Sequence, residues 1–347
     1  MRTAIQLSAD GGAWSSMVDF VVEAERLGVD MVWVAEAWGA DAVSPLGYLA
    51  ARTERIQLGS GVLQLGVRSA AMTAQTALTL AKLSGDRFVL GLGTSGPQVM
   101  EGLHGVSFAR PLRRMRESLD VIRQAFAGER ITYEGRHLRL PLPGGEGKAL
   151  RLSIEANDRI PIYVAALSPK LLELTGEQAD GWLGTSFVPE AAEAAYLGHL
   201  RSGAERAGRS LADIDICQGA EVAFARDETE LAAIVGVRRP GLAFSLGGMG
   251  SAATNFYNRA YARQGFAEVA AEAQQRWLAG DRAGATDAIP DEMVLATTLI
   301  GTEEMVAERL EVWRDSGVTT VRLYPAGDTL DERLTTLGRA LDLVPDR

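Results

Sequence analysis

The chain has 347 residues, of which 47% are hydrophobic and 23% charged, so it can bury a sizeable core. Its formal net charge of -10 leaves no basic surplus, which argues against nucleic acid as a partner. Cys217 is the only cysteine, which excludes a disulfide framework within the chain and a cysteine-based zinc site. The chain shows no signal-peptide pattern and no apolar run long enough to span a membrane, so we expect a cytoplasmic protein without a membrane partner.

Short apolar runs alternate with helical patterns along the chain, which favours βα units around a parallel sheet. Eight strands are predicted, at residues 3–8, 31–36, 56–63, 88–94, 161–167, 181–186, 214–224 and 320–324. Helices are predicted between and after them, at residues 14–27, 42–53, 70–83, 111–126, 169–179, 189–207, 302–316 and 330–343.

Two segments interrupt this alternation. Residues 130–158 contain an alternating run at 131–140 around Glu134 and Gly135, which predicts a hairpin. Residues 236–296 carry helical patterns but no clear strand. Eight strands with two insertions predict a single (β/α)8 TIM-barrel domain over residues 1–347, because a closed barrel leaves no edge strand unprotected. An open, doubly wound sheet is the alternative.

The glycine-rich turn Gly91–Gly96 follows the fourth predicted strand and has the spacing G-x-G-x-x-G. It does not open the fold, and no acidic residue ends a strand about 20 positions on, so a dinucleotide fingerprint is not indicated. Pro97 stands where a helix can begin, and free N–H groups at a helix start favour an anion such as phosphate. The alternative is a tight barrel turn without a ligand.

Two other strand ends carry candidate residues. Gly59 and Gly61 in the third predicted strand indicate a bulge or a close ligand approach, with a simple kink as the alternative. Glu36 ends the second strand and is a candidate acid, base or hydrogen-bond acceptor, or else a helix-capping or surface carboxylate. The three histidines match no metal-ligand spacing, so no metal site is expected, and only His104 lies close to the glycine-rich turn.

Five segments, in order and over nearly the whole chain, resemble the luciferase-like monooxygenase superfamily: residues 28–36, 59–62, 88–94, 161–166 and 179–182. Within it the chain looks closest to the branch that uses coenzyme F420, a 5-deazaflavin. The run at 93–99 is similar to that branch, although members that use flavin mononucleotide share its frame.

The resemblance implies an oxidoreductase that transfers a hydride between C5 of the deazaflavin and an organic small-molecule substrate, in a homodimer. It also implies a cis peptide bond between Gly61 and Val62, behind the cofactor ring. The implied cofactor contacts are Glu36, Gly61, Val62, Gln64, Thr94, Ser95, Gly96, Pro97, Gln98, Val99, Ala165, Ala166 and Leu167. The candidate substrate contacts are Trp14, Trp38, Phe187 and Met249, for which core or interface packing is the alternative.

The chain departs from its relatives in two places. Many of them place a histidine after the acid at the end of strand two, where this chain has Glu36 followed by Ala37. The role of Glu36 therefore stays open between coenzyme binding and proton transfer. The family's glucose-6-phosphate dehydrogenase has a glutamate where this chain has Gly96, which argues against sugar-phosphate oxidation. The alternatives are a monooxygenase that uses flavin mononucleotide and a non-catalytic flavin-binding barrel, and cofactor identity decides between the reaction classes.

Overall fold

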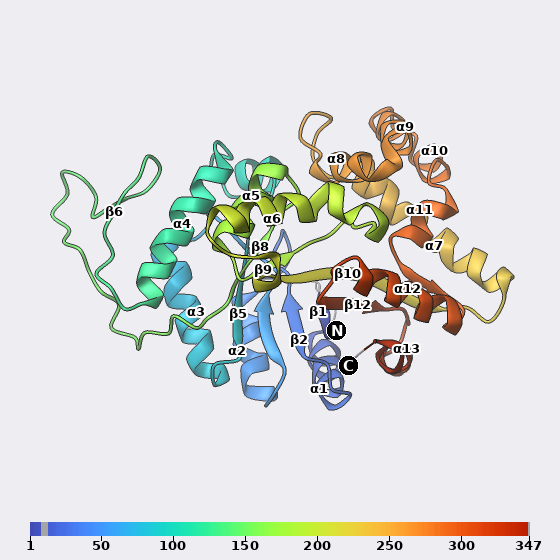
Figure 1. Cartoon of the computed structure of the whole chain (residues 1–347), viewed down its shortest axis with the longest axis horizontal. Coiled ribbons are helices and arrows are strands. Elements are labelled where there is room, and N and C mark those ends of the chain that lie inside the picture. The colour runs from blue at the N-terminus through green and yellow to red at the C-terminus, as the bar shows by residue number, and fades with distance from the viewer. Residues whose placement is uncertain (8–12, 346–347) are drawn as a thin grey trace. The chain divides into compact units, whose positions relative to one another are not determined.

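The computed structural model describes residues 1–7 and 13–345 (Figure 1). The strands follow the order β11-β10-β12-β1-β2-β3-β5-β8-β9, and β9 also pairs with β10, so the sheet closes into the predicted (β/α)8 barrel. The strands of this sheet are β1 (Arg2–Leu7), β2 (Met31–Val34), β3 (Gln57–Ser60), β4 (Leu63–Gln64), β5 (Phe88–Gly93), β8 (Ile162–Ala165), β9 (Gly181–Leu183), β10 (Asp215–Phe224), β11 (Leu299–Gly301) and β12 (Thr320–Pro325).

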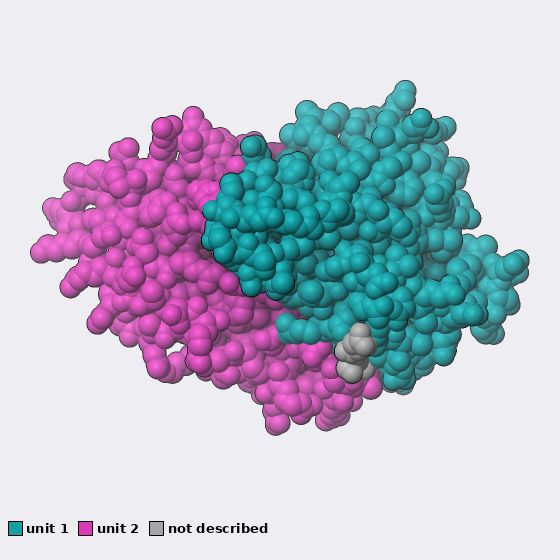
Figure 2. All heavy atoms as spheres, viewed as in Figure 1, with its two compact units in different colours: residues 1–5, 166–176, 182–347 teal, residues 6–165, 177–181 magenta. Residues whose placement is uncertain are grey.

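The chain divides into two compact units, which Figure 2 colours separately. Unit 1 comprises residues 1–5, 166–176 and 182–347, and unit 2 comprises residues 6–165 and 177–181. The single domain expected from the sequence stays a prediction. No helix among residues 1–7 and 13–345 is long and apolar enough to cross a membrane.

Most helices match the predicted ranges to within about two residues, since their apolar faces repeat at helical spacing. The helices are α1 (Trp14–Arg26), α2 (Val43–Arg52), α3 (Ala70–Ser84), α4 (Pro111–Phe126), α5 (Pro169–Gln178), α6 (Gly198–Arg206), α12 (Glu303–Asp315) and α13 (Leu330–Leu343). The helix predicted at residues 189–207 is broken into two short turns followed by α6.

The predicted third strand is two strands, β3 and β4, separated by Gly61 and Val62. The strands predicted at 161–167 and 181–186 end earlier, at Ala165 and Leu183. Ser8, the last residue of the first predicted strand, lies outside the described residues. After β8 the predicted strand was too long because the apolar residues Ala166 and Leu167 continue into the loop.

The hairpin predicted in the first insertion is confirmed, with short antiparallel strands β6 (Tyr133–Glu134) and β7 (Arg139–Leu140). The Glu117 carboxylate of α4 accepts hydrogen bonds from the three backbone N–H groups of residues 136–138, at 3.1, 2.8 and 2.6 Å. A Cβ atom on Gly135 would lie 2.4 Å from Glu117 Oε2, so a larger residue there would displace the carboxylate. The hairpin is therefore held to α4 by one buried carboxylate.

A second contact holds the same hairpin. Arg114 Nε of α4 donates to His137 Nε2 at 3.0 Å, which requires a neutral imidazole that accepts at this nitrogen. Burial, and then the neighbouring Arg114 charge, lower the pKa of His137. The docked hairpin thus favours the unprotonated form of His137.

The second insertion is helical, as predicted. It begins earlier, at α7 (Glu228–Gly247), because the Asp227 side chain caps that helix by accepting from the N–H of Glu230 at 2.9 Å. The further helices are α8 (Phe256–Tyr261), α9 (Ala267–Leu278), α10 (Arg282–Asp287) and α11 (Asp291–Ala296). Strand β11 was not predicted, since its three residues are too few to show an alternating pattern.

Two buried aromatic side chains pack together between the strands of unit 2. The rings of Trp33 in β2 and Tyr163 in β8 lie 5.2 Å apart, and both side chains are buried. A Cβ atom on Gly59 would lie 2.4 Å from the Trp33 ring, and one on Gly181 would lie 2.3 Å from the Tyr163 ring. The glycines in these strands therefore make room for large neighbours, in addition to any role beside a ligand.

Candidate functional site

Three residues at the carboxyl ends of β4, β5 and β8 form a row across the sheet. Gln64 pairs with Gly93, and Gly93 pairs with Ala165. Partners in a parallel register have side chains on the same face, so this face carries one amide and two very small residues. A Cβ atom on Gly93 would lie 2.5 Å from Val62 Cγ2 and 3.7 Å from Ala165 Cβ. Val62, Gln64 and Ala165 were all predicted cofactor contacts. The structure thus brings Val62 and Gln64 close to Ala165, about 100 residues further along the chain, within unit 2.

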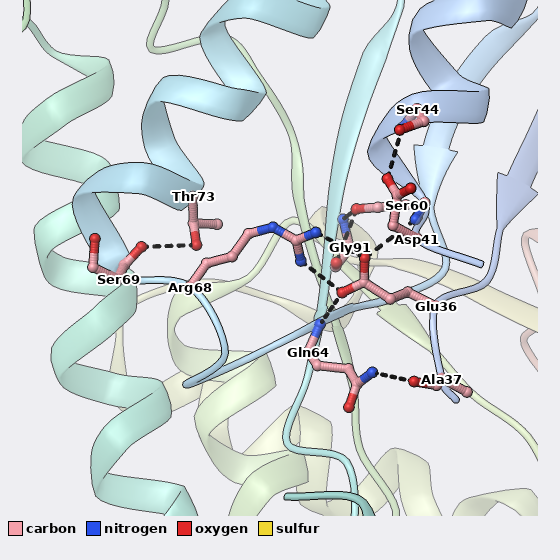
Figure 3. A network of polar contacts seen from close by, with 11 residues as sticks. Glu36, Ala37, Asp41, Ser44, Ser60, Gln64, Arg68, Ser69, Thr73 and Gly91 are labelled. Atoms are coloured by element: carbon pink, nitrogen blue, oxygen red, sulfur yellow. Dashed lines mark hydrogen bonds and ion pairs between the residues drawn. The ribbon is translucent and has the colours of Figure 1, made fainter. Parts of the chain in front are cut away.

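The peptide bond between Gly61 and Val62 is cis, as the resemblance implied. The preceding residue fixes this bulge to β5, as Figure 3 shows for Ser60 and Gly91: Ser60 Oγ donates to the Gly91 carbonyl and accepts from the Gly91 N–H, each at 2.9 Å. A Cβ atom on Gly91 would lie only 1.9 Å from the Ser60 carbonyl oxygen. Gly91 is therefore required by the approach of β3 to β5.

The glycine-rich turn divides into two parts. Gly91 and Gly93 belong to β5 and allow neighbouring chain segments to approach, whereas a Cβ atom on Gly96 would meet nothing within 4 Å. The helix start expected at Pro97 is confirmed, because Pro97 precedes a short π-helical turn, Gln98–Leu103. Among the described residues, the N–H groups of Ser95 and Gly96 donate to no protein acceptor. The part of the turn that is available to an anion is therefore Ser95–Gly96.

Glu36 forms the centre of a polar network (Figure 3). Its two carboxylate oxygens accept from Arg68 Nη1 at 2.6 Å and Nη2 at 2.9 Å, and from the N–H groups of Ala42 at 3.1 Å and Gln64 at 3.4 Å. The Glu36 side chain is only 8% exposed, and its hydrogen bonds raise the pKa of the Arg68 guanidinium. Arg68 was not a candidate from the sequence, because nothing local marks a loop arginine as the partner of a distant acid.

Gln64 has one satisfied and one unsatisfied side-chain atom. Its Nε2 donates to the Ala37 carbonyl at 2.7 Å, while its Oε1 is buried and has no hydrogen-bond partner among the described residues. The residue is 4% exposed. Buried acceptors without a partner are uncommon and each calls for a physical reason, such as a missing ligand or water.

The candidate substrate residues of unit 2 are in different surroundings. Trp14 at the start of α1 lines an almost wholly apolar cavity of about 300 Å³ between α1 and α2, together with Leu7, Pro45 and Tyr48. Trp38 is 64% exposed in the loop that precedes α2. Their substrate contacts stay predictions.

The candidates of unit 1 include one core residue. Phe187 is 2% exposed and packs against Trp182, Tyr196 and Trp313, with ring centroids 5.3 to 6.3 Å apart. Phe187 is therefore a core residue, the alternative given for it above, since a ring enclosed by three others has no face left for a substrate. Met249 is partly buried just after α7.

Ala166 and Leu167 follow β8 in the chain and belong to unit 1. The Ala166 carbonyl accepts from Trp182 Nε1 at 2.9 Å, and the Leu167 carbonyl accepts from Arg263 Nη2 at 2.5 Å. Both carbonyls therefore have protein donors, and the predicted contact of these two residues with the cofactor stays a prediction.

A closed (β/α)8 barrel that concentrates its small and polar residues where the strands end has the arrangement of a barrel enzyme. The family model described as luciferase-like monooxygenase matches residues 1–320, and the chain belongs to this family.

Individual relatives are similar over almost the full length. The chain is 40% identical over 332 residues to a Mycobacterium tuberculosis protein whose name provisionally assigns it as a coenzyme F420-dependent oxidoreductase, with 92% of this chain and 94% of that protein covered. It is 30% identical over 327 residues to 5,10-methylenetetrahydromethanopterin reductase of Methanolobus tindarius, with 92% and 93% covered. The solved coenzyme F420-dependent tetrahydromethanopterin reductase of Methanopyrus kandleri superposes with a TM-score of 0.81 at 23% identity over 97% of each chain, which shows the shared fold.

Proposed function

We propose that the protein is a coenzyme F420-dependent oxidoreductase that transfers a hydride between the deazaflavin and an organic small-molecule substrate. The relative that is 40% identical over 92% of this chain carries that cofactor in its name. The observation that carries the proposal is the row Gln64–Gly93–Ala165 beside Val62. Three neighbouring strands span roughly 10 Å, about the length of a tricyclic ring, and the small side chains leave a flat strip across them.

The residues present fit such a group. Val62 would support one face of the ring, and Ala165 and Gly93 would let it lie close to the strand ends. The unpartnered N–H groups of Ser95 and Gly96 would bind the cofactor's phosphate, with Thr94 and the following residues 97–99 around it. When bound, the deazaflavin supplies the carbon that accepts or releases the hydride. The protein's part is to orient the reactants and to exclude water.

A titration of the purified protein with each cofactor tests the proposal. Binding is measured by the fluorescence of the cofactor. We expect the deazaflavin to bind and flavin mononucleotide to bind far more weakly or not at all. A Gly93→Val variant should lose the binding, because its Cβ atom would lie 2.5 Å from Val62 Cγ2 and would displace Val62 from the row. Gly102→Ala is the matched control, since a Cβ atom there meets nothing within 4 Å.

The reverse preference for cofactors would overturn the proposal. Tight binding of flavin mononucleotide alone would favour the second candidate, a flavin-dependent monooxygenase, which the description of the matching family supports. If Gly93→Val bound the deazaflavin as tightly as the natural chain, the row would not be part of the cofactor site.

We also propose a homodimer located in the cytoplasm. Exposed apolar side chains on α2 and α3, which pack together, support the dimer: Tyr48 and Met72 are both more than half exposed. The lone, buried Cys217 supports a location that needs no disulfides. Light scattering of the purified protein tests the dimer, and a Met72→Glu variant should shift it toward monomer.

A further inference from the structure

One carboxylate in unit 2 ties together three chain segments that end near the cis bulge. Glu36 follows β2 in the chain. It accepts a hydrogen bond from the N–H of Ala42, the residue before α2, and it forms an ion pair with Arg68, just before α3. A fourth donor, the backbone N–H of Gln64, comes from β4. Figure 3 shows Arg68 and Gln64 pointing toward the Glu36 side chain.

This occupancy is unsuited to proton transfer. A carboxylate offers about four acceptor positions, and here four protein donors fill them. A proton could reach Glu36 only if one of these bonds broke, and protonation would then remove the negative charge that is bonded to the partly buried Arg68. The geometry therefore favours a role in which Glu36 fixes the structure around it.

The residue that this pair fixes is Gln64. Its backbone N–H is bonded to Glu36 Oε1, and its side-chain Nε2 is bonded to the Ala37 carbonyl next to Glu36 in the chain. Rotation of the amide by a half turn would place Oε1 against the Ala37 carbonyl oxygen, so the orientation is determined by the bond. The buried Oε1 that remains without a partner is thus an acceptor held in one direction.

We propose that Glu36 and Arg68 form a positioning pair that holds Gln64, so that Gln64 Oε1 accepts a hydrogen bond from a ring N–H at the edge of a bound heterocycle. The proposal rests on the proposed function, since the pyrimidine edge of a deazaflavin carries such an N–H. It assigns Glu36 no proton transfer. Gln64 contacts the ligand, whereas Glu36 and Arg68 affect ligand binding only by holding Gln64 in place.

The test measures deazaflavin affinity, which needs no knowledge of the substrate. Fluorescence titration gives Kd for the natural chain, for Glu36→Gln, Arg68→Met and Gln64→Leu, and for the double variants of Arg68→Met with each of the other two. Loss of a group that orients a binding residue weakens affinity roughly 10- to 100-fold, so each single variant should raise Kd by about that factor. Both double variants should be no weaker than their weaker parent, because all three residues act through one contact.

Glu177→Gln is the matched control. It removes the bidentate ion pair of Glu177 with Arg116, which also lies in unit 2 but away from the row, so Kd should not change. Thermal unfolding of every variant separates a loss of affinity from a loss of fold. An unchanged Kd in folded Arg68→Met, or independent multiplying losses in the double variants, would overturn the positioning pair while leaving the proposed function intact. A natural chain that binds no deazaflavin would overturn both.

Discussion

Substitution of Gly91 by alanine tests the closest backbone approach in unit 2. The new Cβ atom would lie 1.9 Å from the Ser60 carbonyl oxygen and 3.2 Å from the Trp33 ring. Since real Cβ contacts essentially never fall below 3.0 Å, β3 and β5 would have to separate by about 1 Å at this point. The side chain of Trp33 is buried and cannot move aside to relieve the contact.

The expected loss of stability has two parts. Insertion of a methyl group into a packed interior costs about 1–3 kcal/mol. A separation of about 1 Å would also break the two hydrogen bonds between Ser60 Oγ and Gly91, now 2.9 Å each, at about 0.5–1.5 kcal/mol apiece. We therefore expect Gly91→Ala to lower the free energy of unfolding by about 2–6 kcal/mol.

Urea denaturation of Gly91→Ala beside Gly96→Ala measures this loss. Gly96 lies in the same turn but has open space around its Cα atom, so Gly96→Ala should stay within about 0.5 kcal/mol of the natural chain. Equal stability of the two variants would refute this prediction, because it would show that β3 can approach β5 as closely when residue 91 has a Cβ atom.

Three further substitutions test packing and charge. Phe187→Ala should lower the free energy of unfolding by about 3–5 kcal/mol, as for a buried aromatic; unchanged urea stability would return Phe187 to the substrate candidates. Glu117→Gln should cost about 1–3 kcal/mol, and hydrogen exchange at residues 136–138 should become faster; unchanged exchange there would contradict the role given to Glu117. The lowered pKa of His137 means that the unfolded chain binds its proton first, so stability should fall as pH drops below 6.5, the ordinary value. Urea midpoints between about pH 5 and 8 should therefore decline more for the natural chain than for His137→Gln, and parallel curves would contradict the role of Arg114.

The barrel could be predicted from the sequence because its elements are long and strongly periodic. Eight apolar runs and the helices between them specify a parallel sheet almost without regard to the exact ends. The unpredicted β11 is an exception that follows from its length, since three residues carry no period. The division of the third strand by Gly61 and Val62 was visible as two glycines, but its extent depends on the neighbouring strands.

The site was only partly predictable, for a different reason. A glycine in a strand signals that something comes close, but the sequence does not say what. Gly59 faces Trp33, Gly91 faces the Ser60 backbone and Gly93 faces Val62, so these glycines accommodate protein neighbours. The pairing of Glu36 with a specific arginine depends on two loops that meet only in the folded barrel, and the sequence offers many arginines.

Core packing and the candidate site are coupled through the same residues. Trp33 requires glycine at positions 59 and 61, and the second of these is the neighbour in the chain of Val62, whose side chain lies beside Gly93. The flat strip at the strand ends therefore depends on the large ring that fills the interior beneath it. A smaller residue in place of Trp33 would leave a cavity beside Gly59, Gly61 and Gly91, which now lie against its side chain. Changes in this core should consequently alter cofactor affinity as well as stability, whereas packing changes confined to the helices of unit 1, such as α9, should alter stability alone.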